Sequence, residues 1–182
     1  MIVRMKDVII HDKTFREMIS EEAIQGRIAE LALKLNEDLR GKDVVFVGIL
    51  NGAFMFAADL FRRIDFQARI SFVKLASYRG TSSSGTIKEL IGWNEDLKDK
   101  TVVVIEDIVD TGNTLERITD ELFMRKAAEI KIAAMFCKPE TYKKDIPLDY
   151  IGFDIPNDFV VGYGLDYDGY GRNLPSVYSV IN

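Results

Sequence analysis

Three carboxylates lie close together in the sequence, directly after a run of apolar residues. Glu106 and Asp107 follow four β-branched residues, and Asp110 comes three positions later. The segment from Asp110 to Thr114 is rich in small and polar residues, and a helical pattern follows it from Leu115. A buried strand, a small-residue turn and a helix N-terminus together make an anion site, because backbone N–H groups converge there and the helix dipole adds positive potential. We therefore expect a substrate that carries phosphate, hydroxyl groups and Mg²⁺.

The carboxylates suit several kinds of chemistry. Ribose hydroxyls are donors that match carboxylate acceptors, and the same oxygens can hold Mg²⁺ directly or through water. Glu106 and Asp107 are neighbours on an expected strand, where side chains alternate between faces, so both face one site only if the backbone turns at the strand's end. Asp110 beside a phosphate cradle could be a general acid/base at a nearby nitrogen. The alternative is that Asp110 only caps the helix, since Asp is a favoured N-cap residue.

Strands that alternate with helices must position these residues. The apolar pattern predicts strands at 8–10, 43–50, 68–75, 101–106 and 130–136, with helices at about 20–41, 51–64 and 115–126. Such alternation implies right-handed βαβ crossovers, and hence an α/β fold with a mostly parallel central sheet flanked by helices.

After Lys138 the pattern changes to short strands without helices between them, at 149–153, 159–164 and 176–181. These strands predict a small hood lobe over the carboxyl edge of the sheet, which the N-terminal strand could join. We expect a single domain over residues 1–182, with a core of about 15–138 and a hood of about 1–14 and 139–182.

The composition argues against several classes of protein. The 24 basic and 29 acidic residues give a net charge of −5, which argues against general nucleic-acid binding. The sequence contains no run of 18 apolar residues, so no membrane span is predicted, and the N-terminal residues lack a signal-peptide core. The single Cys137 excludes an internal disulfide and fits a reducing cytoplasm, which is the location we expect. His11 is the only histidine, so the sequence has almost none of the residues that zinc sites and histidine-based catalytic triads require.

The stretch 102–114 resembles the PRPP-binding motif of the type I phosphoribosyltransferases: four apolar residues, two acids, two apolar residues, Asp-Thr-Gly, a variable residue and Thr. The alternative is an ordinary strand–loop–helix, although paired acids at a strand's carboxyl end are poor structural choices. The resemblance implies that Glu106 and Asp107 contact the ribose hydroxyls and Mg²⁺ of PRPP. It also implies that Asp110 is a general acid/base near purine N7, and that the 5′-phosphate binds to Asp110, Thr111, Gly112, Asn113 and Thr114.

The last third of the chain resembles the carboxyl-terminal segment of the hypoxanthine-guanine phosphoribosyltransferases. The resemblance implies that Phe159 stacks on a purine and that the backbone of Val160 reads its edge, although such a strand alone is more often core. It further implies that Asp166 contacts the base and a second Mg²⁺, and that Arg172 contacts pyrophosphate. Lys138 ends the fifth strand, and its ammonium can only donate, so it favours a 6-oxopurine over adenine.

Two loops complete the expected site. Asn51 and Gly52 stand where the family has its pyrophosphate loop, often with a non-proline cis peptide; the alternative is an ordinary strand-to-helix turn. Many relatives carry Lys or Arg at the position of Asn51, so its neutral side chain shifts pyrophosphate binding onto Mg²⁺, backbone amides and Arg172. Ser77 and Tyr78 precede a low-complexity loop at 79–86, which is either a lid that excludes water or a solvated connection.

The resemblance runs from about residue 8 to residue 180. It implies a Mg²⁺-dependent purine salvage enzyme, a homodimer or homotetramer, that converts PRPP and hypoxanthine or guanine to IMP or GMP and pyrophosphate. One alternative is a phosphoribosyltransferase for xanthine, adenine or a pyrimidine. Another is a PRPP-binding nucleic-acid regulator, against which the retained Asp110 and the acidic net charge argue. We expect small-molecule partners, with no nucleic acid and no membrane.

Overall fold

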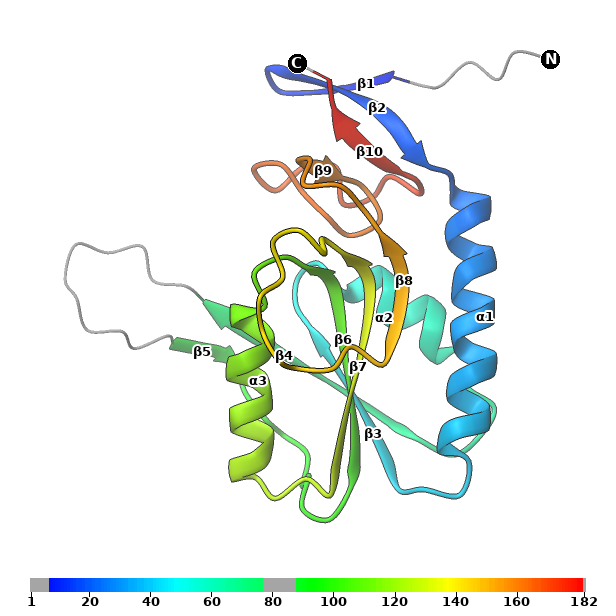
Figure 1. The fold of residues 1–182 in the computed structure, drawn as a ribbon, viewed down its shortest axis with the longest axis vertical. Coiled ribbons are helices and arrows are strands. Elements are labelled where there is room, and N and C mark those ends of the chain that lie inside the picture. The colour runs from blue at the N-terminus through cyan, green and yellow to red at the C-terminus, as the bar shows by residue number, and fades with distance from the viewer. Residues whose placement is uncertain (1–6, 77–87, 182) are drawn as a thin grey trace.

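The computed structural model describes residues 7–76 and 88–181, which form two sheets and three helices (Figure 1). The larger sheet contains β3 (Val44–Ile49), β4 (Arg69–Ala76), β5 (Lys88–Ile91), β6 (Thr101–Val109), β7 (Glu129–Cys137) and β8 (Tyr150–Asp154). The smaller sheet contains β1 (Asp7–Ile10), β2 (Lys13–Ile19), β9 (Val160–Val161) and β10 (Val177–Val180). The helices are α1 (Glu21–Leu39), α2 (Phe54–Phe61) and α3 (Asn113–Met124).

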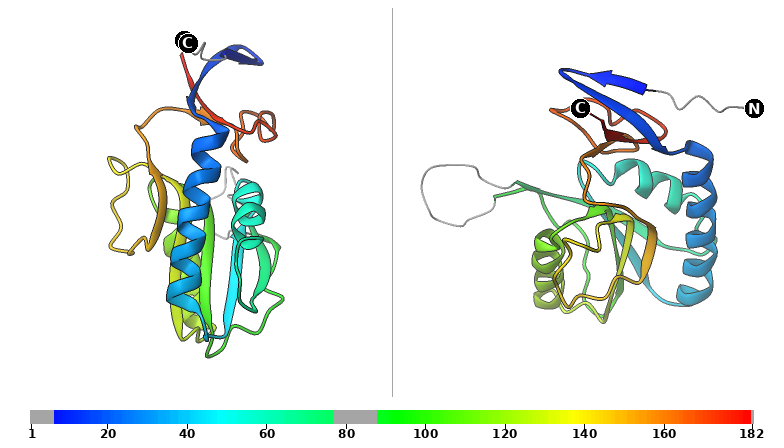
Figure 2. Two further views of the ribbon diagram at one scale, coloured as in Figure 1. Left: turned by 90° about the vertical axis from the view of Figure 1, so that its right-hand side faces the viewer. Right: turned by 45° about the horizontal axis from the view of Figure 1, so that its top comes forward.

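The larger sheet has the strand order β5-β4-β3-β6-β7-β8, and its strands are parallel except for the antiparallel β5. Helices α1 and α2 cover one face and α3 covers the other, as Figure 2 also shows. Successive residues of β3 therefore enter different cores: Val44 and Phe46 pack with α1 and α2, and Val45 and Val47 pack with α3. Burial on both faces explains why this strand is apolar at nearly every position.

Helix α1 follows its sequence signals closely. The hydroxyl of Ser20 accepts a hydrogen bond from the Ala23 amide at the N-cap, and Gly41 has a φ of +84° directly after the C-cap residue. The predicted apolar stripe is buried throughout: Ile24, Ile28, Leu31, Leu35 and Leu39. Each such side chain contributes about 1.5–3 kcal/mol when it leaves water, so packing outweighs intrinsic propensity in holding this helix.

The smaller sheet is antiparallel, with the strand order β1-β2-β10-β9, and lies over the carboxyl ends of the large sheet (Figures 1 and 2). We call this sheet and its connecting loops the hood. It has its own small core, which centres on Phe15, Val161 and Tyr178. Strand β2 runs into α1, and the Glu21 amide at their junction donates to the Ser176 hydroxyl at 3.1 Å. The two ends of the chain thus build one lobe, as the sequence suggested.

Several predicted boundaries were wrong. Strand β2 was not predicted because its alternating polar and apolar residues lack a buried run, and β5 was not predicted either. The strand at 149–153 was placed with the hood, but it is β8 of the large sheet, held in part by Arg27, which donates to the Gly152 and Ile151 carbonyls. Strand β6 continues to Val109, α2 ends at Phe61, and α3 begins at Asn113. In the predicted strand at 159–164 only Val160 and Val161 pair with β10, because positive φ angles follow.

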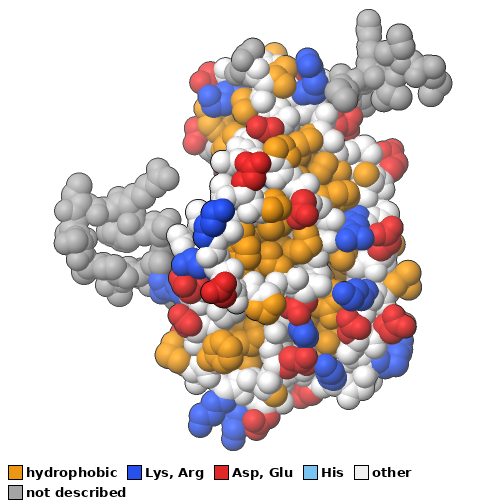
Figure 3. All heavy atoms as spheres, in the orientation of Figure 1, with side chains coloured by type: hydrophobic (Ala, Val, Ile, Leu, Met, Phe, Trp, Pro, Cys, Tyr) orange, Lys and Arg blue, Asp and Glu red, His pale blue; other side chains and the backbone are white. Residues whose placement is uncertain are grey.

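Among the described residues, no helix is long and apolar enough to cross a membrane. On the face drawn in Figure 3, acidic and basic side chains are interspersed, and neither sign forms one continuous field.

Candidate active site

A cavity of about 420 Å³ lies at the carboxyl ends of β3 and β6. It brings together three segments that are far apart in the sequence: the loop after β3, the β6–α3 segment and the hood. This is the edge at which open parallel sheets bind ligands. The described residues that line it are Ile49, Leu50, Asn51, Gly52, Glu106, Asp107, Asn113, Thr114, Arg117, Asp166 and Arg172.

Glu106 and Asp107 both line this cavity, although neither ends a strand. Strand β3 pairs with β6 only as far as the Gly48–Ile105 pair, whereas β7 pairs along the other edge as far as Val109. Beyond Ile105, this edge of β6 is therefore unpaired among the residues that the structure describes. Side chains from opposite faces of β6 can reach the same space around that open edge. The predicted turn at the acids was wrong, but the shorter neighbouring strand has the same effect.

The two carboxylates lie in contrasting surroundings. Glu106 is only 6% exposed, and its burial, followed by the negative charge of Asp107, raises the pKa of the Glu106 carboxyl well above its usual value. Asp107 accepts a hydrogen bond from the Ile108 amide at 2.8 Å. A Cβ atom on Gly52 would lie 1.4 Å from Asp107 Oδ2, so a side chain at position 52 would force this carboxylate or the loop after β3 to move.

This donor set fits a divalent cation. Two adjacent carboxylates, one of them buried, would be relieved of mutual repulsion by a cation, and hard carboxylate oxygens are the ligands that Mg²⁺ prefers. Among the residues that the structure describes, no group of three His, Cys, Asp or Glu side chains is arranged to hold a metal ion. Glu106 and Asp107 would therefore hold an ion together with oxygens that the substrate brings.

The loop between β6 and α3 has the shape of an anion cradle. Gly112 is the N-cap residue of α3, with a φ of +83°, and a Cβ atom there would lie 2.6 Å from the ring of Tyr142. The first amide with an intrahelical acceptor belongs to Glu116, which donates to the Gly112 carbonyl, so the preceding amides remain available to an anion. The N-cap makes no side-chain hydrogen bond. The alternative that Asp110 only caps this helix was therefore wrong.

Asp110 and Lys138 meet at the carboxyl ends of two neighbouring strands. The Lys138 ammonium lies 3.7 Å from Asp110 Oδ2, and its side chain is 10% exposed whereas that of Asp110 is 47% exposed. The Lys138 amide donates to the Val109 carbonyl at 2.9 Å, which continues the β6–β7 pairing past the strand end. One carboxylate open to solvent thus lies beside one buried cation, an arrangement that can hold a heterocycle with both an acidic N–H and a carbonyl.

The hood supplies an aromatic surface. Phe159 is 45% exposed. The centroid of its ring lies 5.7 Å from that of Tyr167, in an edge-on arrangement, and 6.2 Å from that of Phe15, in a tilted one. Val160 is buried in β9, which pairs with β10. A large aromatic ring held from behind and open in front can stack on a planar ligand. The stacking role of Phe159 stays a prediction.

Asp166 and Arg172 form an ion pair at the mouth of the cavity, with 2.7 Å between Asp166 Oδ1 and Arg172 Nη2. Arg172 also donates to the Gly164 carbonyl at 2.7 Å, and Asp166 Oδ2 accepts from the Gly169 amide at 2.7 Å. Gly164 packs against the loop after β3, because a Cβ atom there would lie 2.1 Å from the Gly52 carbonyl oxygen. The hood therefore presents a preformed Asp–Arg pair directly above the predicted pyrophosphate loop.

The loop after β3 contains a cis peptide bond between Leu50 and Asn51, as the family resemblance suggested. Asn51 and Gly52 both line the cavity; Asn51 is exposed and Gly52 is buried. Sequence reasoning did not single out Arg117, which lines the same cavity. Its spacing of three residues from Thr114 on α3 was the signal available. Ser77, Tyr78 and the predicted lid at 79–86 lie outside the described residues.

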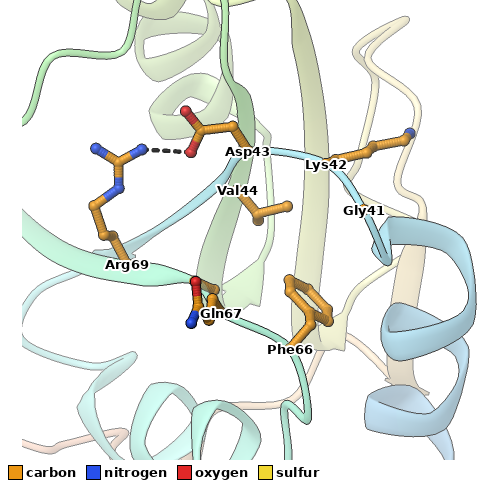
Figure 4. Close-up of a pocket in the computed structure, with 8 residues that line it drawn as sticks. Gly41, Lys42, Asp43, Val44, Phe66, Gln67 and Arg69 are labelled. Carbon is orange, nitrogen blue, oxygen red and sulfur yellow. Dashed lines mark hydrogen bonds and ion pairs between the residues drawn. The ribbon is translucent and has the colours of Figure 1, made fainter.

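A larger cavity of about 540 Å³ lies at the opposite, amino end of β3 and β4 (Figure 4). Its walls come from residues 41–44 and 66–69, and an ion pair between Arg69 and Asp43 crosses its rim. It lacks the convergence of acids, backbone donors and arginines that marks the cavity at the carboxyl edge. Chemistry, rather than size, therefore selects the carboxyl-edge cavity as the candidate active site.

Comparison with known proteins gives the family. Residues 16–168 match the model of the phosphoribosyl transferase domain. The chain belongs to the phosphoribosyltransferase family. It is 41% identical to the hypoxanthine-guanine phosphoribosyltransferase of Aquifex aeolicus, over 94% of this chain and 97% of that protein. It is 40% identical to the hypoxanthine phosphoribosyltransferase of Escherichia coli, over 92% of this chain and 96% of the relative.

Solved structures agree with this assignment. The crystal structure of a hypoxanthine phosphoribosyltransferase from Staphylococcus aureus matches with a TM-score of 0.84 and 42% identity, over 90% of each chain. The predicted α/β fold, with its mostly parallel sheet and small separate lobe, is thereby confirmed for this phosphoribosyltransferase.

Proposed function

We propose that this phosphoribosyltransferase transfers the 5-phosphoribosyl group of PRPP to hypoxanthine or guanine, giving IMP or GMP and pyrophosphate. The observation that carries the choice of base is the buried Lys138 ammonium 3.7 Å from Asp110, at the edge where the ribose-binding acids also lie. The relatives named for hypoxanthine and guanine, at about 40% identity over nearly the whole chain, support the same choice.

The proposed reaction breaks the bond between ribose C1′ and the pyrophosphate oxygen and forms a bond from C1′ to purine N9. The imidazole proton of the base passes to Asp110, which is exposed enough to reach N7 and lies 3.7 Å from the Lys138 ammonium. The transition state resembles an oxocarbenium ion, as in glycoside cleavage. Glu106 and Asp107 orient the ribose hydroxyls, and the α3 amides with Thr111 and Thr114 hold the 5′-phosphate.

Base selectivity follows from hydrogen-bond direction. Lys138 can only donate, so it matches the 6-oxo oxygen of hypoxanthine or guanine and opposes the 6-amino group of adenine. A buried ammonium that faces another donor costs about 1–3 kcal/mol or more. Phe159 would stack on the purine, and the backbone of Val160 and Asp166 would contact its edge.

Mg²⁺ is the cofactor that we propose. Glu106 and Asp107 would hold one ion, and Asp166 would contribute to a second site together with the substrate, although its Oδ1 is paired with Arg172 and its Oδ2 accepts a hydrogen bond from the Gly169 amide. When bound, the cation would offset the charge that develops on the departing pyrophosphate. On the family resemblance we further propose a homodimer or homotetramer, and the buried single Cys137 agrees with a cytoplasmic location.

A spectrophotometric assay with PRPP, Mg²⁺ and each of hypoxanthine, guanine, xanthine and adenine tests the proposal. We expect turnover of the first two and none of adenine. Lys138→Ala should reduce the preference for hypoxanthine over adenine by about tenfold or more. Lys131→Ala is the matched control, because Lys131 pairs with Asp149 at the far end of β7. An unchanged preference in Lys138→Ala would contradict the role of Lys138, and turnover of adenine alone would contradict the substrate class.

A further inference from the structure

Arg117 is the charged lining residue of the active-site cavity to which neither the sequence motifs nor the proposed roles assign a function. It lies on α3, three residues after Thr114 and four after Asn113, and these three residues share one face of the helix. All three line the active-site cavity. Arg117 is half-buried, so its position is constrained by the surrounding structure.

The cavity has an excess of negative charge where a polyanion must bind. Its ionisable walls are the carboxylates of Glu106, Asp107 and Asp166 and the guanidinium groups of Arg117 and Arg172. Arg172 already pairs with Asp166 and donates to a hood carbonyl. The loop after β3 contributes no charge, because Asn51 is neutral.

We propose that Arg117 binds the pyrophosphate group of the substrate and supplies, from α3, the positive charge that the loop after β3 lacks. This inference rests on the proposed function. The guanidinium fork matches phosphate oxygens and remains charged at any working pH. The amino end of α3 adds potential of the same sign.

The position of Arg117 favours pyrophosphate over the 5′-phosphate. The cavity that Arg117 lines contains all three predicted pyrophosphate residues, Asn51, Gly52 and Arg172, but only Asn113 and Thr114 of the five-residue 5′-phosphate cradle. Arg117, in the second turn of α3, therefore shares its cavity with the complete set of predicted pyrophosphate residues.

Calorimetric binding separates these roles without relying on turnover. The probes are inorganic pyrophosphate with Mg²⁺, and IMP, which carries a 5′-phosphate and no pyrophosphate. In Arg117→Gln we expect the Kd for pyrophosphate to rise about tenfold to a hundredfold, and the Kd for IMP to change less than about twofold. Arg40→Gln removes the same charge from an exposed ion pair with Asp65, at the C-cap position after α1, and it should leave both constants unchanged.

A rescue variant tests whether the charge itself is what matters. Asn51→Lys placed in the Arg117→Gln protein should recover at least about fivefold of the lost pyrophosphate affinity, because it returns a cation to the same cavity. Unchanged pyrophosphate binding in Arg117→Gln, or equal losses for pyrophosphate and IMP, would overturn the assignment. If the unaltered protein binds neither probe and turns over no purine, the proposed function fails, and this inference fails with it.

Discussion

Asp110 is the residue on which the chemical step depends in our proposal. The Asp110→Asn variant keeps the size of the side chain but cannot accept the purine proton, so turnover should fall about 10²–10⁴-fold. The binding of PRPP should change much less, because the ribose acids and the α3 amides remain. Steady-state kinetics and calorimetric binding of PRPP measure the two effects separately. Near-normal turnover would remove Asp110 as the general acid/base.

Glu106 predicts a pH dependence of stability. Its carboxyl has a raised pKa in the folded protein, mainly because of burial and then because of Asp107, so the folded state holds this proton more tightly than the unfolded state does. Its contribution to stability is therefore present at low pH and is lost as the pH rises from the unfolded pKa near 4.5 toward the higher folded value. Above the unfolded pKa, the burial of Glu106 therefore opposes folding.

The Glu106→Gln variant should remove that dependence. Without divalent metal, we expect the variant to unfold at a higher temperature than the unaltered protein at pH 7, and the difference to shrink toward pH 4.5. Added Mg²⁺ should stabilise the unaltered protein more than the variant, since a ligand stabilises the state that binds it. Thermal unfolding across this pH range, with and without Mg²⁺, measures both effects. A difference that is independent of pH would contradict the assigned cause.

At the scale of elements, the end of β3 controls the site. Gly52→Ala would place a methyl group 1.4 Å from Asp107 Oδ2, so the loop or the carboxylate must move. We expect at least about a hundredfold loss of kcat/KM for PRPP, because misplaced binding groups forfeit most of the advantage of orientation.

Gly26→Ala is the matched control for Gly52→Ala. Gly26 lies inside α1, and a Cβ atom there would have nothing within 4 Å. This change should leave kcat/KM unaltered and raise the free energy of unfolding by about 0.5–1 kcal/mol, as Gly to Ala does inside helices. Retained activity in Gly52→Ala would show that the contact with Asp107 does not set the geometry of the site.

The elements also show what sequence can and cannot predict. The motif from Glu106 to Thr114 was recognisable because its acids, small residues and apolar strand adjoin one another in the chain. The reason that both acids reach one cavity was not predictable, since it depends on the β3–β6 pairing stopping at the Gly48–Ile105 pair. Strand β2 escaped prediction because its pairing partners, β1 and β10, decide its conformation. Arg117 was missed for a similar reason: its importance depends on which residues lie across the cavity.

At the scale of the whole molecule, the hood must keep a fixed position relative to the core. Tyr163, which has a φ of +48°, is fully buried beneath the hood, and its hydroxyl donates to Asp59 Oδ2 on α2 at 2.8 Å. The same oxygen accepts from Gln25 of α1 at 2.7 Å, so one carboxylate joins three parts of the fold. Burial, and then the bond to Asp59, raises the pKa of the Tyr163 hydroxyl, which therefore stays a donor.

The Tyr163–Asp59 hydrogen bond, which we call the anchor, fixes the geometry of the active site because both residues are close in sequence to segments that line it. Asp59 lies on α2, the helix that follows the loop containing Gly52, and the next residue after Tyr163 is Gly164, which packs on that loop. Gly164 in turn donates to the Arg172 carbonyl and accepts from the Arg172 side chain. The loop after β3 and the hood segment that carries Arg172 are therefore both positioned relative to α2.

Tyr163→Phe tests this coupling between hood and core. The variant keeps the ring but loses its bond to Asp59, which should lower the free energy of unfolding by about 1–2 kcal/mol. Asp59 retains Gln25 as a partner, so the fold should persist. Because Arg172 and Asp166 then lose their fixed position over the core, we expect the Kd for pyrophosphate with Mg²⁺ to rise severalfold. Tyr167→Phe is the control, since its hydroxyl bonds Asp12 within the hood. A loss of stability in Tyr163→Phe with unchanged pyrophosphate affinity would mean that the anchor holds the fold and does not position the site.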